Sequence, residues 1–332
     1  MNRFKMSALC AAAICWSASG WAAPSAELIV VIGAPGTEEY GKAFQSAAAA
    51  WEATGKQGKA AITVIGKEET GTLDLKTLEA TITESGGEGS LPLWVVLLGH
   101  GTFDGREAKF NLRGKDLGAG QLAEWLKEFK RPVAIVNCSA SSAPFIKKLA
   151  APGRVVMTAT KAGSEDSYAR FGEHLAGSIH SSDADLDRDG ATSLLEAFLA
   201  ASKGVEEFYE KEGRIMTEHA LVDDNGDGFG TPATWFRGVR AVKKAKDDAK
   251  LDGLRAHQFH LVPSPADLAL SPEIRQRRDA LEAELFALRE KKGTMEEEAY
   301  FQELEKLARE LAQLYHADDD PAPASADEPS AP

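Results

Sequence analysis

Cysteine is scarce in this sequence. The 332 residues include three cysteines, at positions 10, 15 and 138. Cys10 and Cys15 lie in an apolar N-terminal segment, so Cys138 is the single thiol in the remainder of the chain. This scarcity excludes a fold held together by internal disulfide bonds. A lone thiol is either buried or used chemically, and Cys138 is therefore a candidate functional residue.

Excess positive charge is also lacking. Lys and Arg number 38 against 51 Asp and Glu, which gives a formal net charge of −13. A surface of this sign repels nucleic acid and anionic membranes, so neither is expected as a partner. The hydrophobic share is 43%, which is enough to build a packed core. Local groups of carboxylates suit a hard cation such as calcium.

The N-terminal segment, residues 1–23, is typical of a signal peptide. Arg3 and Lys5 precede an apolar run that reaches to about residue 21. We expect cleavage after Ala22 or Ala23, export to the periplasm or the extracellular space, and no membrane attachment afterwards. The alternative is a membrane anchor, but the run is shorter than the roughly 20 residues that a spanning helix needs.

Five apolar segments predict the strands of a parallel sheet. They cover residues 27–32, 60–65, 93–98, 133–136 and 155–160. Segments with apolar residues at helical spacing separate them, over residues 40–51, 73–82, 117–129 and 144–149. Apolar strands that alternate with amphipathic helices are typical of a sheet covered on both faces. We therefore predict an α/β domain over residues 24–180, with a three-layer, mostly parallel sheet flanked by helices.

The rest of the chain divides into four segments. Residues 181–235 carry two acidic loops, and residues 236–270 form a connecting segment with a predicted edge strand at 256–262. Residues 271–317 predict a helical hairpin or coiled coil that either packs on its own domain or associates with another chain. The tail, residues 318–332, reads DDDPAPASADEPSAP and is expected to be disordered.

The first acidic loop, DLDRDGATSLLE, matches the EF-hand pattern D-x-D-x-D-G-x5-E. Calcium binds six to eight oxygen atoms, and this spacing wraps one chain around one ion. The predicted ligands, at loop positions one, three, five, seven, nine and twelve, are Asp185, Asp187, Asp189, the carbonyl of Ala191, Ser193 and Glu196. Gly190 provides the sharp turn at the sixth position. Thr192 stands at the eighth position, where paired EF-hands usually carry an aliphatic residue, so a single structural site is favoured over a regulatory pair.

The second acidic loop, residues 223–228, is a weaker calcium candidate. Asp223, Asn225 and Asp227 repeat the same alternation. Thr234 occupies the position of the twelfth-position glutamate. The alternative is an Asx- and Gly-rich turn that binds no ion.

His100 and Cys138 each follow a predicted buried strand. Because ligands bind at the carboxyl ends of parallel strands, both side chains are expected at one edge of the sheet. The imidazole could lower the pKa of the thiol, and the N–H of Gly101 could bind an oxyanion. The alternative is that Cys138 is a small core residue and His100 a turn residue.

The segments GHGTFDG and VAIVNCSAS, supported by VVMTAT and EDSYA, resemble the caspase, legumain, metacaspase and clostripain clan of cysteine peptidases. The resemblance covers roughly residues 27–180. It implies a caspase-like (caspase–haemoglobinase) fold and a peptide or protein substrate. It also implies a catalytic dyad of Cys138 and His100, with the Gly101 N–H in the oxyanion hole.

The sequence thus predicts an exported calcium-binding protein with a caspase/legumain-like cysteine peptidase domain. The alternative is a non-catalytic calcium-binding relative that acts as a secreted or periplasmic interaction protein. Calcium is the expected cofactor of either.

Overall fold

A computed structural model describes residues 24–67, 73–246 and 249–316 of the chain. The predicted signal peptide and the predicted disordered tail lie outside these ranges. None of the helices in the described ranges is both long enough and apolar enough to span a membrane.

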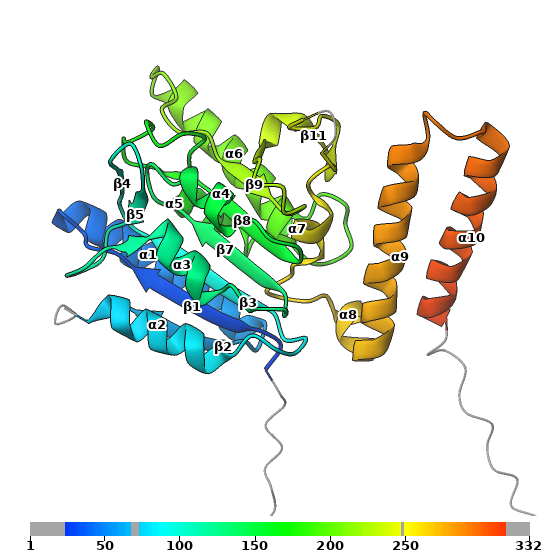
Figure 1. Cartoon of the computed structure of the whole chain (residues 1–332), viewed down its shortest axis with the longest axis horizontal. Helices are drawn as coiled ribbons and strands as arrows, with labels where there is room; N and C mark the ends of the chain where they lie inside the picture. Colours follow the sequence, from blue (N-terminus) through cyan, green and yellow to red (C-terminus); the bar gives the residue numbers. More distant parts are fainter. Residues whose placement is uncertain (1–23, 68–72, 247–248, 317–332) are drawn as a thin grey trace, which may run out of the picture.

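The centre of the structure is a seven-stranded sheet with the order β10-β9-β8-β7-β3-β1-β2 (Figure 1). Five strands are parallel: β1 (Glu27–Ile32), β2 (Ala61–Ile65), β3 (Leu93–Leu98), β7 (Val133–Asn137) and β8 (Arg154–Thr158). The short strands β9 (Leu221–Asp223) and β10 (Thr231–Pro232) are antiparallel and complete one edge. The inner strands are buried along their whole length, as apolar runs predict.

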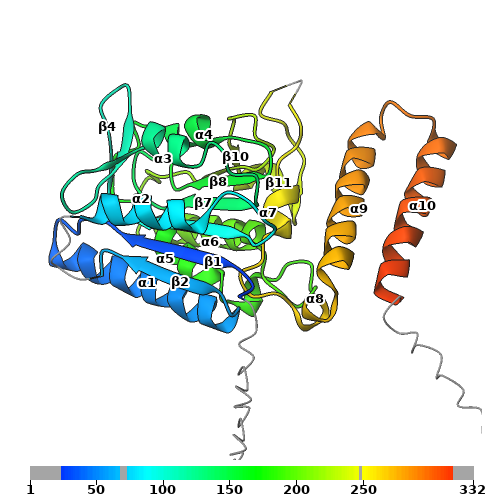
Figure 2. The same cartoon turned by 60° about the horizontal axis from the view of Figure 1, so that its bottom comes forward.

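Helices cover both faces of the sheet (Figures 1 and 2). One face packs against α1 (Glu38–Gln57), α5 (Phe171–Ser178) and α6 (Leu194–Lys211). The other packs against α2 (Asp74–Ser85), α3 (Ala119–Trp125) and α4 (Pro144–Leu149). Each face has its own cluster of buried apolar side chains. The predicted α/β class, with a mostly parallel sheet between two helical layers, is confirmed.

The predicted helix over residues 117–129 is shorter than expected. Leu117–Gly118 forms strand β6, which pairs with β5 (Ala108–Phe110). β5 in turn pairs with β4 (Gly101–Phe103), which begins directly after His100. Leu117, at the start of the predicted helix, therefore belongs to a small antiparallel sheet at the carboxyl end of β3. A second small hairpin joins β11 (Phe236–Arg237) and β12 (Arg240–Ala241).

The predicted edge strand over residues 256–262 is wrong. The segment instead contains helix α7 (Leu254–Gln258), and a single β-bridge joins His260 to Ser193. Gly253 has a φ of 115°, which a side chain other than glycine rarely adopts. The Asp224 carboxylate accepts the N–H groups of Gly253 and Ala256 at the start of this helix. This capping favours a helical turn over an extended edge.

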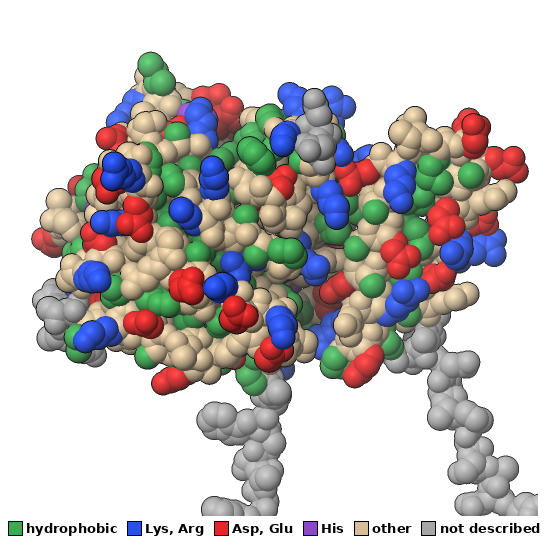
Figure 3. All heavy atoms as spheres, in the orientation of Figure 1, with side chains coloured by type: hydrophobic (Ala, Val, Ile, Leu, Met, Phe, Trp, Pro, Cys, Tyr) green, Lys and Arg blue, Asp and Glu red, His purple; other side chains and the backbone are tan. Residues whose placement is uncertain are grey.

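The predicted helical hairpin consists of α9 (Pro272–Lys291) and α10 (Glu297–His316), preceded by the short helix α8 (Pro265–Ala269). Its two helices pack on each other through a separate apolar cluster that includes Leu281, Leu288, Tyr300 and Leu307. The hairpin stands beside the α/β domain in Figure 1, and acidic and basic side chains are interspersed on the face seen in Figure 3. Gln258 of α7 joins it to the domain by donating to the Asp279 carbonyl and to Glu282.

We predict that Arg154→Met destabilises the fold. The buried guanidinium of Arg154 donates to the carbonyl oxygens of Leu149 and Leu126, each at 2.7 Å. Its loss removes a charged donor from both carbonyl oxygens, of which that of Leu126 still accepts the Phe129 N–H, and costs about 2–3 kcal/mol of unfolding free energy. Urea unfolding measures this cost. The exposed Arg106 is the control, since Arg106→Met is expected to change stability by less than about 0.5 kcal/mol; equal midpoints for the two variants would contradict the prediction.

Candidate functional site

His100 lies between β3 and β4, at the carboxyl end of the sheet. Its ring contacts Tyr40 and Phe44 of α1, with ring centroids 4.8 and 5.2 Å away. Its Nε2 lies 3.2 Å from the carbonyl oxygen of Pro35. The imidazole is therefore half-buried in an aromatic setting on the α1 face of the sheet.

Cys138 directly follows β7 and is 4% exposed. It belongs to the core cluster on the α1 and α5 face, where a Cβ at Gly172 of α5 would lie 2.7 Å from the Cys138 Cβ. Burial, with a smaller contribution from the charge of Glu218, raises the pKa of the thiol far above its ordinary value. Burial thus disfavours the thiolate, which is the nucleophilic form of the group.

Ser139, rather than Cys138, lies against the His100–Gly101 turn. A Cβ at Gly101 would lie 2.6 Å from Ser139 Oγ. The hydroxyl donates to Asn137 Oδ1 at 2.6 Å and the residue is fully buried. Sequence reasoning missed Ser139, although strand alternation contained the signal: Cys138 continues the apolar face of Ala134 and Val136, whereas Ser139 continues the face of Asn137.

The geometry gives the Cys138–His100 dyad little support. A nucleophile must be reachable by substrate and must be activated by a base or cation nearby. Cys138 is enclosed by the core, and the hydrogen bond that the His100 ring makes is with the carbonyl of Pro35. The dyad remains a prediction from the sequence, and the oxyanion role of Gly101 remains a prediction with it.

The first acidic loop runs from Asp185 into α6. Asp185, Asp187 and Asp189 place one carboxylate oxygen each within 4.8 Å of one another. Each also accepts a backbone N–H within the loop: Asp185 from Gly190, Asp187 from Asp189, and Asp189 from Ala191. The second oxygen of Asp185, Oδ1, is buried and has no hydrogen-bond partner among the described residues. An oxygen-rich centre with a free lone-pair site fits a hard cation.

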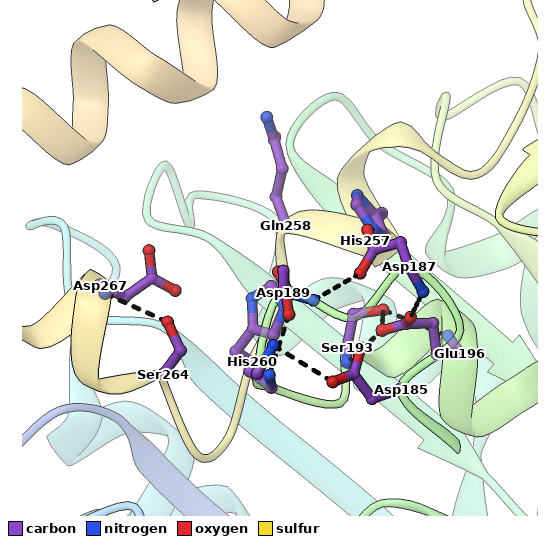
Figure 4. A network of polar contacts seen from close by, with 12 residues as sticks. Asp185, Asp187, Asp189, Ser193, Glu196, His257, Gln258, His260, Ser264 and Asp267 are labelled. Carbon is purple, nitrogen blue, oxygen red and sulfur yellow. Dashed lines mark hydrogen bonds and ion pairs between the residues drawn. The ribbon is translucent and has the colours of Figure 1, made fainter. Parts of the chain in front are cut away.

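Glu196 closes this loop from inside the core. Its side chain is fully buried, and Oε1 accepts the N–H groups of Leu186 and Asp187 at 2.7 and 3.3 Å. Oε2 accepts the N–H and the hydroxyl of Ser193, which also caps α6. Figure 4 shows these side chains gathered with His257, whose Nε2 lies 2.9 Å from Asp187 Oδ2.

The second acidic loop shares three hydrogen bonds with the first at the same positions, and Asp223 Oδ1 also accepts the N–H of Gly226, whereas Asp185 Oδ1 has no such donor in the described part of the chain. Asp223, at position one, accepts the N–H of Gly228, at position six, as Asp185 accepts that of Gly190. Asn225 accepts from position five and Asp227 from position seven, as Asp187 and Asp189 do in the first loop. The fourth and sixth residues of both loops have positive φ: Arg188, Gly190, Gly226 and Gly228.

Asp252 occupies the place of the twelfth-position acid in the second loop. Its Oδ1 accepts the N–H groups of Asp224 and Asn225, positions two and three, as Glu196 Oε1 does in the first loop. Its Oδ2 accepts the hydroxyl of Thr231, position nine, at 2.5 Å, as Glu196 accepts that of Ser193. The sequence pattern missed Asp252 because it lies outside the loop. Thr234, which stands at the twelfth position, takes part in none of these hydrogen bonds.

Two residues of the second loop, Asp223 and Asp224, and Asp252 from outside it have buried carboxylates. Burial raises the pKa of Asp223 to about 6. Burial also raises the pKa of Asp224 and Asp252, and the charge of Asp224 adds to the shift at Asp252. Three acids in one buried place repel one another when ionised, and a divalent cation would relieve that repulsion.

The sequence matches no protein-family model and no curated protein. Among solved structures it is similar to the Drosophila initiator caspase Dronc, with 13% identity and a TM-score of 0.40 over 62% of this chain and 81% of that one. It is also similar to caspase-1 from Spodoptera frugiperda, with 9% identity and a TM-score of 0.38 over 60% of this chain and 86% of that one. The assignment to the α/β class is based on the sheet and helices of this chain, and not on these similarities.

We predict that Cys138 of the folded protein reacts slowly with iodoacetamide. Because the thiol is buried and protonated, the rate is expected to be about 100-fold below that of the urea-unfolded chain. His100→Ala is expected to leave the rate unchanged, as measured by mass spectrometry of the alkylated protein. Rapid alkylation that is lost in the His100 variant would instead support the dyad.

We also predict that, in buffer free of divalent cations, stability falls as the pH rises through about 6. The folded-state pKa of Asp223 is raised from 3.8 to about 6, so its favourable contribution is present below 3.8 and is lost above 6. The shift corresponds to about 3 kcal/mol at most. Urea midpoints at pH 4.5 and 7.5, compared with those of Asp223→Asn, isolate this carboxyl. An equal pH dependence in both proteins would rule out its contribution.

Proposed function

We propose that this chain is an exported calcium-binding protein in which two acidic loops each bind one ion. The single observation that carries the proposal is the hydrogen-bond pattern that the two loops share. In both, an acid from outside the turn holds the N–H groups of positions two and three, at Glu196 and Asp252. In the first loop, positions one, three and five also place carboxylate oxygen atoms within 4.8 Å of one another.

For the first loop we propose the ligand set that the sequence predicts. The side-chain oxygens of Asp185, Asp187, Asp189 and Glu196 would hold the ion, together with Ser193 and the carbonyl of Ala191. The unpaired, buried oxygen of Asp185 supports this assignment, because a buried acceptor without a donor is costly unless a ligand satisfies it. Calcium supplies charge compensation and a centre of six to eight oxygens.

The second loop would use Asp223, Asn225 and Asp227, with Asp252 in place of a twelfth-position glutamate. An ion here would offset the repulsion among the buried carboxylates of the loop. Both loops adjoin the core: Asp223 ends β9 of the sheet edge, and Glu196 lies in the first turn of α6. Binding would therefore stabilise the packing of α6 and of the sheet edge.

Export is part of the proposal. Calcium loops of modest affinity are filled where calcium is plentiful, as it is outside the cytoplasm. The predicted signal peptide over residues 1–23 supports export, and Cys138, the one cysteine after it, has no second cysteine with which to form an internal disulfide bond. The peptidase activity on a peptide or protein substrate is the second candidate, and it rests on the sequence resemblance. The hairpin of α9 and α10 is the candidate surface for a partner or a second copy.

We predict that the exported chain binds two calcium ions, as measured by isothermal titration calorimetry. Asp187→Asn is expected to weaken one site by about 10–100-fold, and Asp252→Asn the other by a similar factor, since each removes a carboxylate that organises one loop. Wild-type protein is expected to melt at a lower temperature in EDTA.

The exposed Asp166 lies outside both loops, so Asp166→Asn is the matched control and is expected to bind as wild type does. A chain that releases no heat with calcium and melts at the same temperature in EDTA would refute the proposal. Binding of one ion that is insensitive to Asp252→Asn would remove the second loop from it.

A further inference from the structure

One short segment, Asp252–His260, contacts both acidic loops, and we call it the clasp. At its beginning, the Asp252 carboxylate binds the N–H groups of Asp224 and Asn225 in the second loop. At its other end, His257 Nε2 lies 2.9 Å from Asp187 Oδ2 of the first loop. The two loops are far apart in sequence, yet these contacts are separated by a single turn of helix.

Backbone contacts reinforce both ends of the clasp. Asp224 of the second loop accepts the N–H groups of Gly253 and Ala256 at 2.9 and 2.8 Å. Leu194, next to the first loop's Ser193, donates to the Phe259 carbonyl at 2.8 Å. Each loop therefore holds the backbone at one end of α7, in addition to its side-chain contacts with the clasp.

The clasp is also rigid, because its middle is packed in the core. Ala256 is fully buried and Phe259 is 4% exposed. The Phe259 ring meets Trp94 of β3 edge to face, with centroids 5.5 Å apart. A rigid segment held at both ends cannot follow a movement of one loop without disturbing its contacts with the other.

We propose that the two calcium loops bind cooperatively, with the clasp as the element that couples them. This inference rests on the proposed calcium function. An ion in the second loop fixes Asp252 and thereby the position of α7. His257, Phe259 and His260 then already lie in their positions beside the first loop when that loop binds its ion. Because the clasp is rigid and moves as one piece, the first ion bound bears the cost of setting its position, and the second ion binds to a loop whose contacts with the clasp are already placed. Linkage requires the effect to be reciprocal.

The test compares loops in the full-length chain with calcium as the only added ligand. Asp223→Asn/Asp227→Asn disables the second loop without touching the clasp, and Asp185→Asn/Asp189→Asn disables the first. In each variant the remaining loop is expected to bind calcium about 5-fold or more weakly than the corresponding stepwise constant of the wild type. The two factors are expected to be equal.

Ala256→Gly provides a second variant that keeps every hydrogen bond of α7 but makes the helical turn more flexible. Two ions are still expected to bind, with the coupling factor reduced toward one. Two ions bound with unchanged constants in the loop variants would overturn the coupling while the proposed function stands. Binding of no ion by the wild type would instead overturn the proposed function, and a coupling factor unaffected by Ala256→Gly would remove the clasp as its carrier.

Discussion

Two buried acids, Glu196 and Asp252, are the constraint on which residues 181–260 depend. Each accepts two consecutive backbone N–H groups at the beginning of a loop and a hydroxyl near its end. Such bonds orient the loop so that alternate side chains face inward. Burying a carboxylate costs free energy unless hydrogen-bond donors and a positive charge compensate it. The binding of a cation would therefore stabilise the folded form of these loops.

Both loops lie where the chain returns to the central sheet. The first leads into α6, whose apolar face covers the sheet, and the second connects β9 to β10 at the sheet edge. Ion binding in these places would act on the core through secondary structure, without a disulfide or a large additional core. This arrangement suits a chain in which Cys138 is the sole thiol of the described residues and is itself buried.

The strands and the first loop could be predicted because their signals are local. Apolar runs such as residues 93–98 are buried on both faces, and the spacing of Asp185, Asp187 and Asp189 determines their convergence. Asp252 could not be predicted, because it lies 21 residues after Thr231, its hydroxyl partner, in a segment without a pattern of its own. α7 was missed for the same reason, since its first turn is capped by Asp224 from another loop. The placement of Cys138 depended on strand alternation, which puts it on a covered face and brings Ser139 to the turn.

The attachment of the helical hairpin has a mechanical consequence. Gln258, in the middle of the segment shared by the loops, also donates to the backbone of Asp279 and to Glu282 on α9. α9 has 20 residues and is therefore about 30 Å long. Asp279 and Glu282 lie near the middle of α9, so about 15 Å of helix extends beyond this contact, and a tilt of about 10° there displaces its end by about 3 Å. A small shift of the clasp would thus be enlarged at the end of α9.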